Sequence, residues 1–217
     1  MLTPKIIDLK KSLMDMAGYI QKMIELCITS MEDMNTLILD DVAYYENKVN
    51  RLELEIDDRC AALIALYQPE AKDLRYVLMI IKMNNDFERL GDLAYKIADS
   101  LKAMKDDSLI FSMKELYEMA KKSYAMLQDS IMAFTDEDVA TSKTIGGRDN
   151  EVDKLYEDLY THIKDILKDT TNNIEPSLHI LRIASKFERI ADLATNIGES
   201  TIYLVEGTVI KHHIQEN

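Results

Sequence analysis

The chain has 217 residues, which is enough for one large domain or two small ones with a substantial hydrophobic core. Its 39 acidic residues outnumber its 26 Lys and Arg residues, and the formal net charge of −13 at pH 7 argues against a general nucleic-acid-binding protein. Hydrophobic residues make up 47% of the chain, too many for a disordered acidic tail, and the 6 Gly and 3 Pro residues allow few turns. This composition predicts a few long helices.

Turn-forming and capping residues divide the chain into six predicted helical segments. Asn35-Thr36 is suited to cap the second segment, and Gly207 to end the sixth. The adjacent Gly146 and Gly147 each cost about 1 kcal/mol relative to alanine inside a helix, so a kink or break is expected in the fifth segment. The six segments cover, in chain order, residues 4–34, 36–67, 69–104, 106–134, 135–169 and 174–206.

An internal repeat is the clearest pattern in the sequence. The sequence FERLGDLA at 87–94 recurs as FERIADLA at 187–194, an offset of 100 residues. Each half of the chain supplies three of the six segments. We therefore predict an all-α fold of two tandem three-helix bundles, the first over residues 1–106 and the second over residues 107–217.

Cysteine usage and hydropathy give an expected compartment. The two cysteines, Cys27 and Cys60, are too few for a disulfide framework, so we expect a protein of the reducing cytoplasm. The N-terminal residues lack the apolar core of a signal peptide, and the longest apolar stretches are far too short to span a bilayer, so no membrane insertion is expected. The adjacent His212 and His213 are interpreted as a solvated end rather than a metal-ligand pair.

Pairs of acidic residues at positions i and i+4 continue apolar stripes in the third and sixth segments. On a helical wheel, Glu88 and Asp92 lie on the same side as apolar residues of the third segment, and Glu188 and Asp192 do so in the sixth. We therefore expect these carboxylates to be partly buried. The stripes consist of Leu74, Val77, Leu78, Ile81 and Asn85 in the third segment, and Ile174, Leu178, Leu181 and Ser185 in the sixth.

The second and fifth segments carry acidic and amide residues with similar spacing. These are Glu46, Asn50, Glu53 and Asp57 in the second segment and Asp149 and Asp153 in the fifth. A hairpin that turns at Pro69, which we place in the first turn of the third segment, sets residues at equal distances from it opposite each other. The predicted opposite pairs are Asn50 with Glu88, Glu46 with Asp92, Asp153 with Glu188, and Asp149 with Asp192, the last two across a polar turn at 170–173.

Carboxylates that meet in this way repel each other, and partial burial increases the cost. A divalent or trivalent cation would offset that cost, and carboxylate ligands without sulfur suit iron, Mn²⁺, Mg²⁺ or Ca²⁺, with zinc as a further candidate. A plainer reading stays open, in which Arg89 and Arg189 neutralise neighbouring acids as ordinary ion pairs. The predicted metal ligands are Glu46, Asn50, Glu88, Asp92, Asp149, Asp153, Glu188 and Asp192.

The same residues resemble the PhoU family of phosphate-uptake regulators over nearly the whole chain. The resemblance rests on QP at 68–69 followed by DLR at 73–75, on DNEVD at 149–153, and on the FERLGD and FERIAD sequences of the repeat. It implies pseudo-two-fold symmetry between the bundles and multinuclear metal sites at the paired acidic motifs. Asn50 brings no charge to the first site, which we therefore expect to bind metal less tightly, and Ala191 replaces the glycine usual in the second motif.

The resemblance also implies a regulatory function without catalysis. Members of the family dampen the phosphate-starvation response, and are thought to link the ATP-binding subunit of the phosphate ABC transporter to a phosphate-sensing histidine kinase. We therefore expect a cytoplasmic, metal-binding negative regulator of phosphate uptake that is an adaptor between these two partners, forms a homodimer and binds no nucleic acid.

Two other functions are kept as alternatives. A di-metal carboxylate enzyme in a helical bundle requires Glu-x-x-His pairs that point inward, and the sequence contains none. A metal-free helical scaffold or coiled coil would place the acids at solvated positions, but simple coiled coils repeat every seven residues rather than every hundred. The regulatory function is therefore preferred over both.

Overall fold

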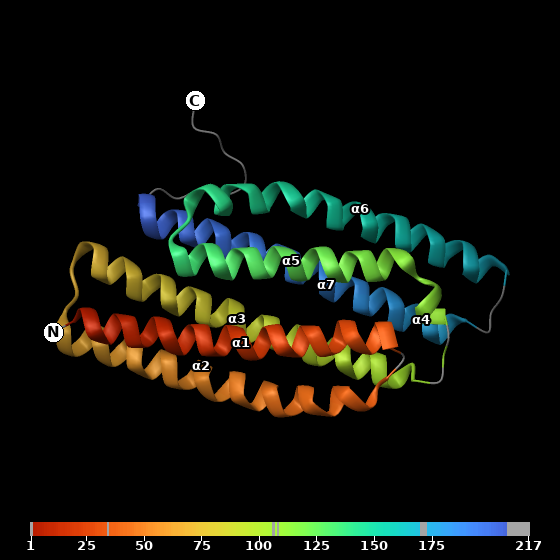
Figure 1. Cartoon of the computed structure of the whole chain (residues 1–217), viewed down its shortest axis with the longest axis horizontal. Helices are drawn as coiled ribbons and strands as arrows, with labels where there is room; N and C mark the ends of the chain where they lie inside the picture. The colour runs from red at the N-terminus through yellow and green to blue at the C-terminus, as the bar shows by residue number, and fades with distance from the viewer. Residues whose placement is uncertain (1, 34, 106, 108, 170–172, 208–217) are drawn as a thin grey trace.

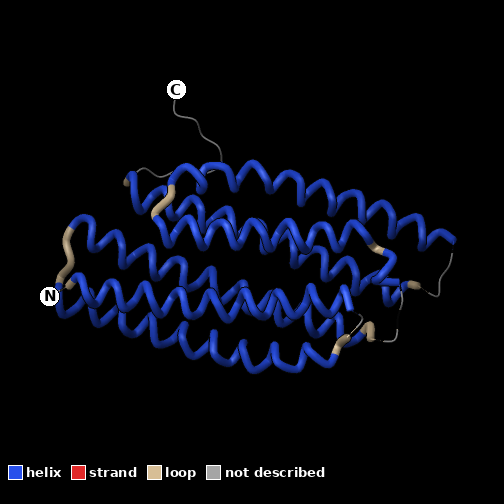
Figure 2. The backbone as a smooth tube through the Cα atoms, viewed as in Figure 1, coloured by secondary structure: helices blue, strands red, loops and turns tan. Residues whose placement is uncertain are grey.

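The computed structural model describes residues 2–33, 35–105, 107, 109–169 and 173–207, and these residues form helices without any β-strand (Figure 2). Six helices are long, and a short 3₁₀ helix and one short α-helix lie in the connections. The long helices are α1 (Thr3–Asp33), α2 (Asp40–Tyr67), α3 (Ala71–Ala103), α5 (Lys114–Asp136), α6 (Val139–Asp169) and α7 (Ile174–Glu206), and the short ones are η1 (Leu37–Leu39) and α4 (Leu109–Ser112).

The long helices form two three-helix bundles that lie side by side (Figure 1). Helices α1, α2 and α3 pack on one another in the first bundle, and α5, α6 and α7 do so in the second. Helix α3 packs along α7, and α1 also contacts α5, so these helices join the bundles. The predicted all-α fold of two tandem bundles is therefore confirmed.

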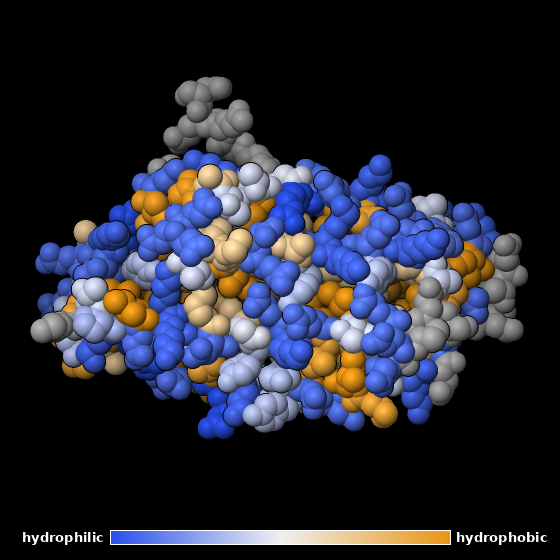
Figure 3. Space-filling view, in the orientation of Figure 1, coloured by the Kyte–Doolittle hydropathy of each residue, from blue (hydrophilic) through white to orange (hydrophobic). Residues whose placement is uncertain are grey.

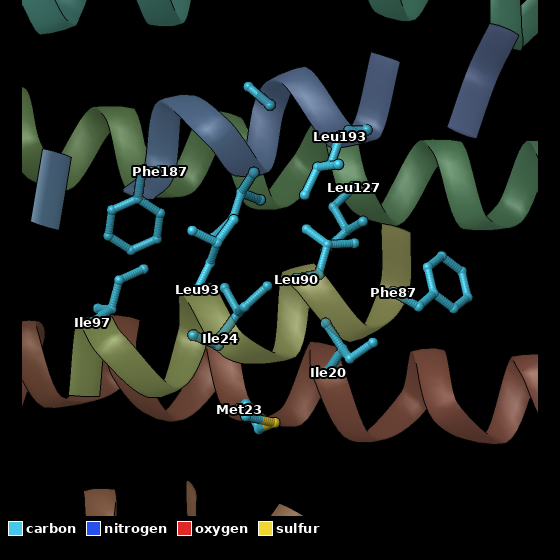
Figure 4. Close-up of a cluster of buried hydrophobic side chains, with 14 of the residues drawn as sticks. Ile20, Met23, Ile24, Phe87, Leu90, Leu93, Ile97, Leu127, Phe187 and Leu193 are labelled. Carbon is cyan, nitrogen blue, oxygen red and sulfur yellow. The ribbon is translucent and has the colours of Figure 1, made fainter. Parts of the chain in front are cut away.

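The core continues from one bundle into the other (Figure 4). Phe87 and Leu90 of α3 lie in one cluster with Phe187 and Leu193 of α7, and α1 adds Ile24 from below. Both phenylalanines are 0% exposed. Full burial of such a side chain stabilises the folded chain by about 1.5–3 kcal/mol, so this shared core holds the bundles together.

The connection between the bundles differs from the predicted single segment over 106–134. Helix α4 ends at Ser112 and α5 begins at Lys114, because the chain bends at Met113, whose side chain is only 2% exposed and packs into the core. The predicted domain boundary falls at residue 106, which lies outside the described residues, so that boundary stays a prediction.

The turn between α5 and α6 lies two residues later than predicted. Helix α5 continues through Asp136, and Glu137 ends it in the left-handed conformation with φ of 55°. Asp138 then caps α6, because its carboxylate accepts a hydrogen bond from the Thr141 N–H at 3.1 Å. The predicted start of the fifth segment at residue 135 is therefore wrong by four residues.

The other helix ends follow the expected chemistry with two shifts, of which the first is that α2 begins at Asp40, after η1, and not at residue 36. Pro69 precedes α3 by two residues instead of lying in its first turn, and Gln68 ends α2 with φ of 46°. The Asn35 side chain accepts a hydrogen bond from the Leu37 N–H at 3.1 Å at the start of η1. Gly207, with φ of 73°, ends α7 as predicted.

Gly146 and Gly147 do not break the fifth segment, because α6 continues through both residues. A Cβ atom at Gly147 would meet no other atom within 4 Å. We therefore expect Gly147→Ala to raise the free energy of unfolding by about 0.5–1 kcal/mol, since alanine has the higher helix propensity. Urea denaturation measures this change, and a variant less stable than the wild type would contradict it.

Two further properties of the described residues bear on the sequence predictions. Cys27 and Cys60 are buried and form no disulfide. No described helix combines the length and the hydropathy that a membrane span requires. On the face shown in Figure 3, hydrophobic residues are interspersed with hydrophilic ones.

Candidate functional site

The hairpin of α2 and α3 sets the positions of the first group of predicted ligands. Asp40, at the start of α2, pairs with Lys102 near the end of α3 at 2.7 Å. At mid-length, the absent side chain of Gly91 permits a close approach of the two helices, because a Cβ atom there would lie 3.1 Å from Val49 Cγ1. The two helices therefore run antiparallel in nearly the register that the sequence predicts.

The structure brings Glu46 of α2 close to Glu88 and Asp92 of α3. The pKa of Glu46 is raised by partial burial and by the negative charges of Asp92 and Glu88. Lys96 Nζ lies 2.5 Å from Asp92 Oδ2 and partly neutralises this carboxylate. The first site is therefore a group of three acids with one lysine beside it.

Asn50, the fourth predicted ligand of the first site, is exposed on α2. Glu53, one turn further along, has a pKa that is raised by partial burial and by the charges of Asp57 and Glu88. Asn84 Nδ2 donates to the Glu53 carbonyl oxygen and to Asp57 Oδ1, each at 2.9 Å. The predicted ligand set omitted Glu53 and Asp57, although their i, i+4 spacing was visible in the sequence.

The second site lies between α6 and α7 and contains Asp153, Glu188 and Asp192. Partial burial and the charges of Asp192 and Asp153 raise the pKa of Glu188. Partial burial and the charge of Asp153 raise the pKa of Asp192, while Arg189 acts in the opposite direction on both groups. Asp149, one turn before Asp153, is half-buried. The second hairpin therefore also brings acids from two helices together.

The two sites differ in how far a basic residue neutralises them. Lys96 forms an ion pair with Asp92 in the first site, and the residue 100 positions later is Asn196, which carries no charge. Asp192 thus lacks the lysine that Asp92 has. Arg189 partly offsets the charges of Glu188 and Asp192, but among the described side chains no ion pair joins it to either of them, so the acids of the second site are neutralised less directly than Asp92 is, and this site is the better candidate for binding a cation.

The apolar stripes that the sequence assigned to these acids are less buried than predicted. Leu78 is 46% exposed and Leu178 is 57% exposed, and Asn85 and Ile174 are also exposed. Val77 of the predicted stripe is buried, but the buried face of α3 continues from it through Ile80 and Phe87, which lie outside the stripe. The acids therefore lie at the edge of the core, because α3 and α7 turn their central faces toward each other and toward α1 and α5.

The ligand atoms of the two sites are of the type that binds a hard cation, but they are not placed to hold one. Carboxylate oxygens from two helices, without cysteine or histidine, are the ligands that Mg²⁺, Mn²⁺ and iron accept. As placed, however, no group of three or more Asp, Glu, His or Cys side chains among the described residues is arranged to hold a metal ion. Metal binding at these sites therefore stays a prediction. His212 and His213 lie outside the described residues.

The fold matches two crystal structures over nearly their whole length. The structure of PhoU from Pseudomonas aeruginosa has a TM-score of 0.90 and 26% sequence identity, and the match covers 96% of this chain and 100% of that chain. The structure of the phosphate transport system regulatory protein PhoU from Streptococcus pneumoniae has a TM-score of 0.89 and 25% identity, with coverage of 98% and 100%.

Sequence comparisons agree with the structural match. A curated relative from Aquifex aeolicus, named phosphate-specific transport system accessory protein PhoU homolog, is 32% identical over 96% of this chain and 95% of its own length. A relative of that name from Clostridium acetobutylicum is 29% identical over 92% of each chain. The PhoU domain matches twice, at residues 13–101 and 116–201, once in each bundle. With one match in each half of the repeat, the chain belongs to the PhoU family.

Proposed function

We propose that this protein is an accessory regulator of a phosphate transport system. The observation that carries the proposal is the double match to the PhoU domain, together with relatives that bear the name phosphate-specific transport system accessory protein. The proposed role is negative regulation of phosphate uptake and of the phosphate-starvation response, in the cytoplasm and without catalysis. The long exposed faces of α2 and α6 suit docking to other proteins.

The proposed partners are the ATP-binding subunit of the phosphate ABC transporter and a phosphate-sensing histidine kinase. A protein of two rigid bundles can contact two partners at once and thereby make the state of one depend on the other. The proposal includes a homodimer, which would present each docking face twice.

We also propose that the two acidic sites bind metal ions. Asp149, Asp153, Glu188 and Asp192 would hold the ion at the second site, and Glu46, Glu88 and Asp92 would do so at the first, with Glu53 nearby. A bound di- or trivalent cation supplies positive charge that carboxylates of neighbouring helices share. The support is the convergence of acids across each hairpin, where their charges raise the pKa of Glu46 and Glu188.

Deletion of the gene tests the regulatory proposal. In phosphate-rich medium, the deletion strain is expected to express phosphate-scavenging genes that the parent represses, and a plasmid copy of the wild-type gene is expected to restore repression. Expression is measured with a reporter fused to a phosphate-starvation promoter.

Two variants carried on the plasmid connect this function to the second site. Glu188→Gln with Asp192→Asn is expected to restore repression less well than the wild type. Glu157→Gln with Asp158→Asn removes the same charge from exposed positions of α6 and is expected to restore it fully. An unchanged reporter after deletion would contradict the regulatory proposal, whereas equal repression by both variants would contradict only the role of the metal.

A further inference from the structure

Helices α3 and α7 form the seam between the two bundles and run in antiparallel directions (Figure 1). Lys82 Nζ of α3 donates a hydrogen bond to Ser200 Oγ of α7 at 2.9 Å, so the start of each helix lies beside the end of the other. Because the internal repeat relates the two helices by 100 residues, the two ends of the seam can be compared position by position.

At the end where α3 begins and α7 ends, an arginine of the chain lies between the two helices. The Arg75 guanidinium carbon is 6.0 Å from the centre of the Tyr203 ring. The guanidinium also lies against Gly207, where a Cβ atom would come within 3.3 Å of Arg75 Cζ. This planar cation therefore rests beside an aromatic ring and at the C-terminus of α7, where the helix dipole is negative.

The opposite end of the seam has a cavity of about 290 Å³ between the end of α3 and the first turns of α7. The residues 100 positions from Arg75, Tyr203 and Gly207 all line this cavity, and they are Glu175, Ala103 and Asp107. An acid thus replaces the arginine, and a methyl group replaces the tyrosine ring. The cavity therefore lies where the other end of the seam holds a guanidinium group.

The polar atoms of the cavity wall are hydrogen-bond acceptors. Asp107 Oδ1 accepts a hydrogen bond from the Leu109 N–H at 2.8 Å, and neither Asp107 nor Glu175 forms an ion pair with a described residue. His179 also lines the cavity, and its Nδ1 atom is buried without a hydrogen-bond partner. With its proton on Nε2, this imidazole is a third acceptor.

The basic residues closest to these segments in sequence are placed elsewhere. Lys102 forms an ion pair with Asp40 at 2.7 Å, and Lys105 lines a small cavity against α1. Arg182, one turn beyond the cavity along α7, does not line it. No Lys or Arg occurs among the undescribed residues of the two adjoining connections, which are 106, 108 and 170–172.

We propose that this cavity binds the guanidinium group of an arginine that is not part of this chain. Asp107, Glu175 and His179 are not arranged to hold a metal ion. A guanidinium has five N–H donors in one plane, so it reaches acceptors that are further apart, and it pairs with carboxylates through two parallel hydrogen bonds. Met104 and Pro176, which also line the cavity, offer apolar contacts to the alkyl stem.

The arginine is either a residue of a partner protein or the free amino acid, since both present the same side chain. The inference stands on the cavity and on the comparison between the two ends of the seam. It does not depend on metal binding or on the proposed regulatory function.

The test is titration of the full-length protein, kept in EDTA, with N-acetyl-arginine methylamide. Binding is followed by the imidazole NMR signals of the 4 histidines, and the His179→Gln variant assigns the signal of His179. This signal is expected to shift until it saturates, while the other three stay in place. N-acetyl-citrulline methylamide has nearly the same shape without the charge and is expected to cause no shift.

Variants at residue 175 test the comparison between the two ends directly. Glu175→Arg places a guanidinium at the position equivalent to Arg75 and is expected to abolish binding of the probe. Glu175→Gln is expected to weaken binding about threefold to tenfold, because a charge-assisted contact at an exposed position is lost. Glu157→Gln removes the same charge from an exposed position of α6 and is expected to leave the affinity unchanged. Circular dichroism checks that all three variants are folded.

Three results would each overturn the proposal. They are an unchanged His179 signal in the wild type, an equal shift with the citrulline probe, and wild-type affinity in Glu175→Arg. When binding is seen, tighter binding of N-acetyl-arginine methylamide than of free arginine supports a partner protein as the source, and the reverse order supports the amino acid. Because the assay contains EDTA and no partner protein, its failure would leave the regulatory and metal-binding proposals untouched.

Discussion

In the presence of EDTA, the Glu188→Gln, Asp192→Asn variant is expected to melt at a higher temperature than the wild type, and in the presence of Mn²⁺ the order is expected to reverse. Without metal, the substitutions remove repulsion among Asp153, Glu188 and Asp192. Because these groups are partly exposed, solvent screens the repulsion, and we expect a gain of about 1–3 °C.

Metal is expected to change the sign, because the proposed site exists only in the folded wild-type chain. An ion at a concentration of about 100 times its Kd stabilises the folded state by about 2.7 kcal/mol. For a chain of this length, that corresponds to a rise of about 5–10 °C in the melting temperature of the wild type. The double variant lacks two of the ligands at the second site, so its rise is expected to be much smaller.

The pH dependence of the metal-free proteins checks the same repulsion. The pKa values of Glu188 and Asp192 in the folded state are raised above 4.5 and 3.8, so folding favours their protonated forms. Their stabilising contribution is complete below the unfolded values and is lost as the pH rises through the raised folded values. In EDTA, the difference in melting temperature between the variant and the wild type is therefore expected to be larger at about pH 7 than at about pH 4.5.

Differential scanning calorimetry with elemental analysis by X-ray fluorescence measures both effects. The Glu157→Gln, Asp158→Asn variant serves as the control and is expected to follow the wild type with and without metal. A double variant that retains the full metal content and the full stabilisation by Mn²⁺ would contradict the assignment of the second site.

The repeat and the long helices could be predicted because both depend on local patterns. The similarity between residues 87–94 and 187–194 implied two equivalent bundles, and the scarcity of Gly and Pro implied few connections. The hairpin register followed from equal distances to a turn, which antiparallel helices obey. Helix ends were less certain, since Asp136 and Asp138 both suit a cap by residue type, and the structure has Asp138 in that role.

Two features could not be predicted because they depend on contacts between helices distant in sequence. A helical wheel shows which residues share one side of a helix but contains no information about its neighbours. Because α3 packs against α1, α2 and α7 at once, its core side differs from the one that the wheel indicated. Leu78 is exposed, and Ile80 and Phe87 are buried. The proximity of Lys96 to Lys186 was hidden for the same reason. Lys96 and Lys186 are 90 residues apart in an acidic chain, and only the packing of α3 on α7 brings their charges together.

Phe187→Ala is expected to lower the free energy of unfolding by about 3–5 kcal/mol, because the substitution leaves a cavity in the core that both bundles share. Leu178→Ala, a truncation on the same helix at a side chain that is 57% exposed, is expected to cost no more than about 0.5 kcal/mol. Urea denaturation followed by circular dichroism measures both changes.

The form of the Phe187→Ala transition tests how far the two bundles depend on each other. Phe187 lies in one cluster with Leu90 and Phe87 of the other bundle, so loss of its ring weakens contacts on both sides of the seam (Figure 4). We expect a single unfolding transition whose midpoint lies at a lower urea concentration and whose m value is unchanged. The reason is that neither bundle is expected to stay folded once the shared core opens. Two separate transitions would show instead that each bundle has a sufficient core of its own. If Phe187→Ala lowered the free energy of unfolding as little as Leu178→Ala does, the centre of the core would lie elsewhere along α7.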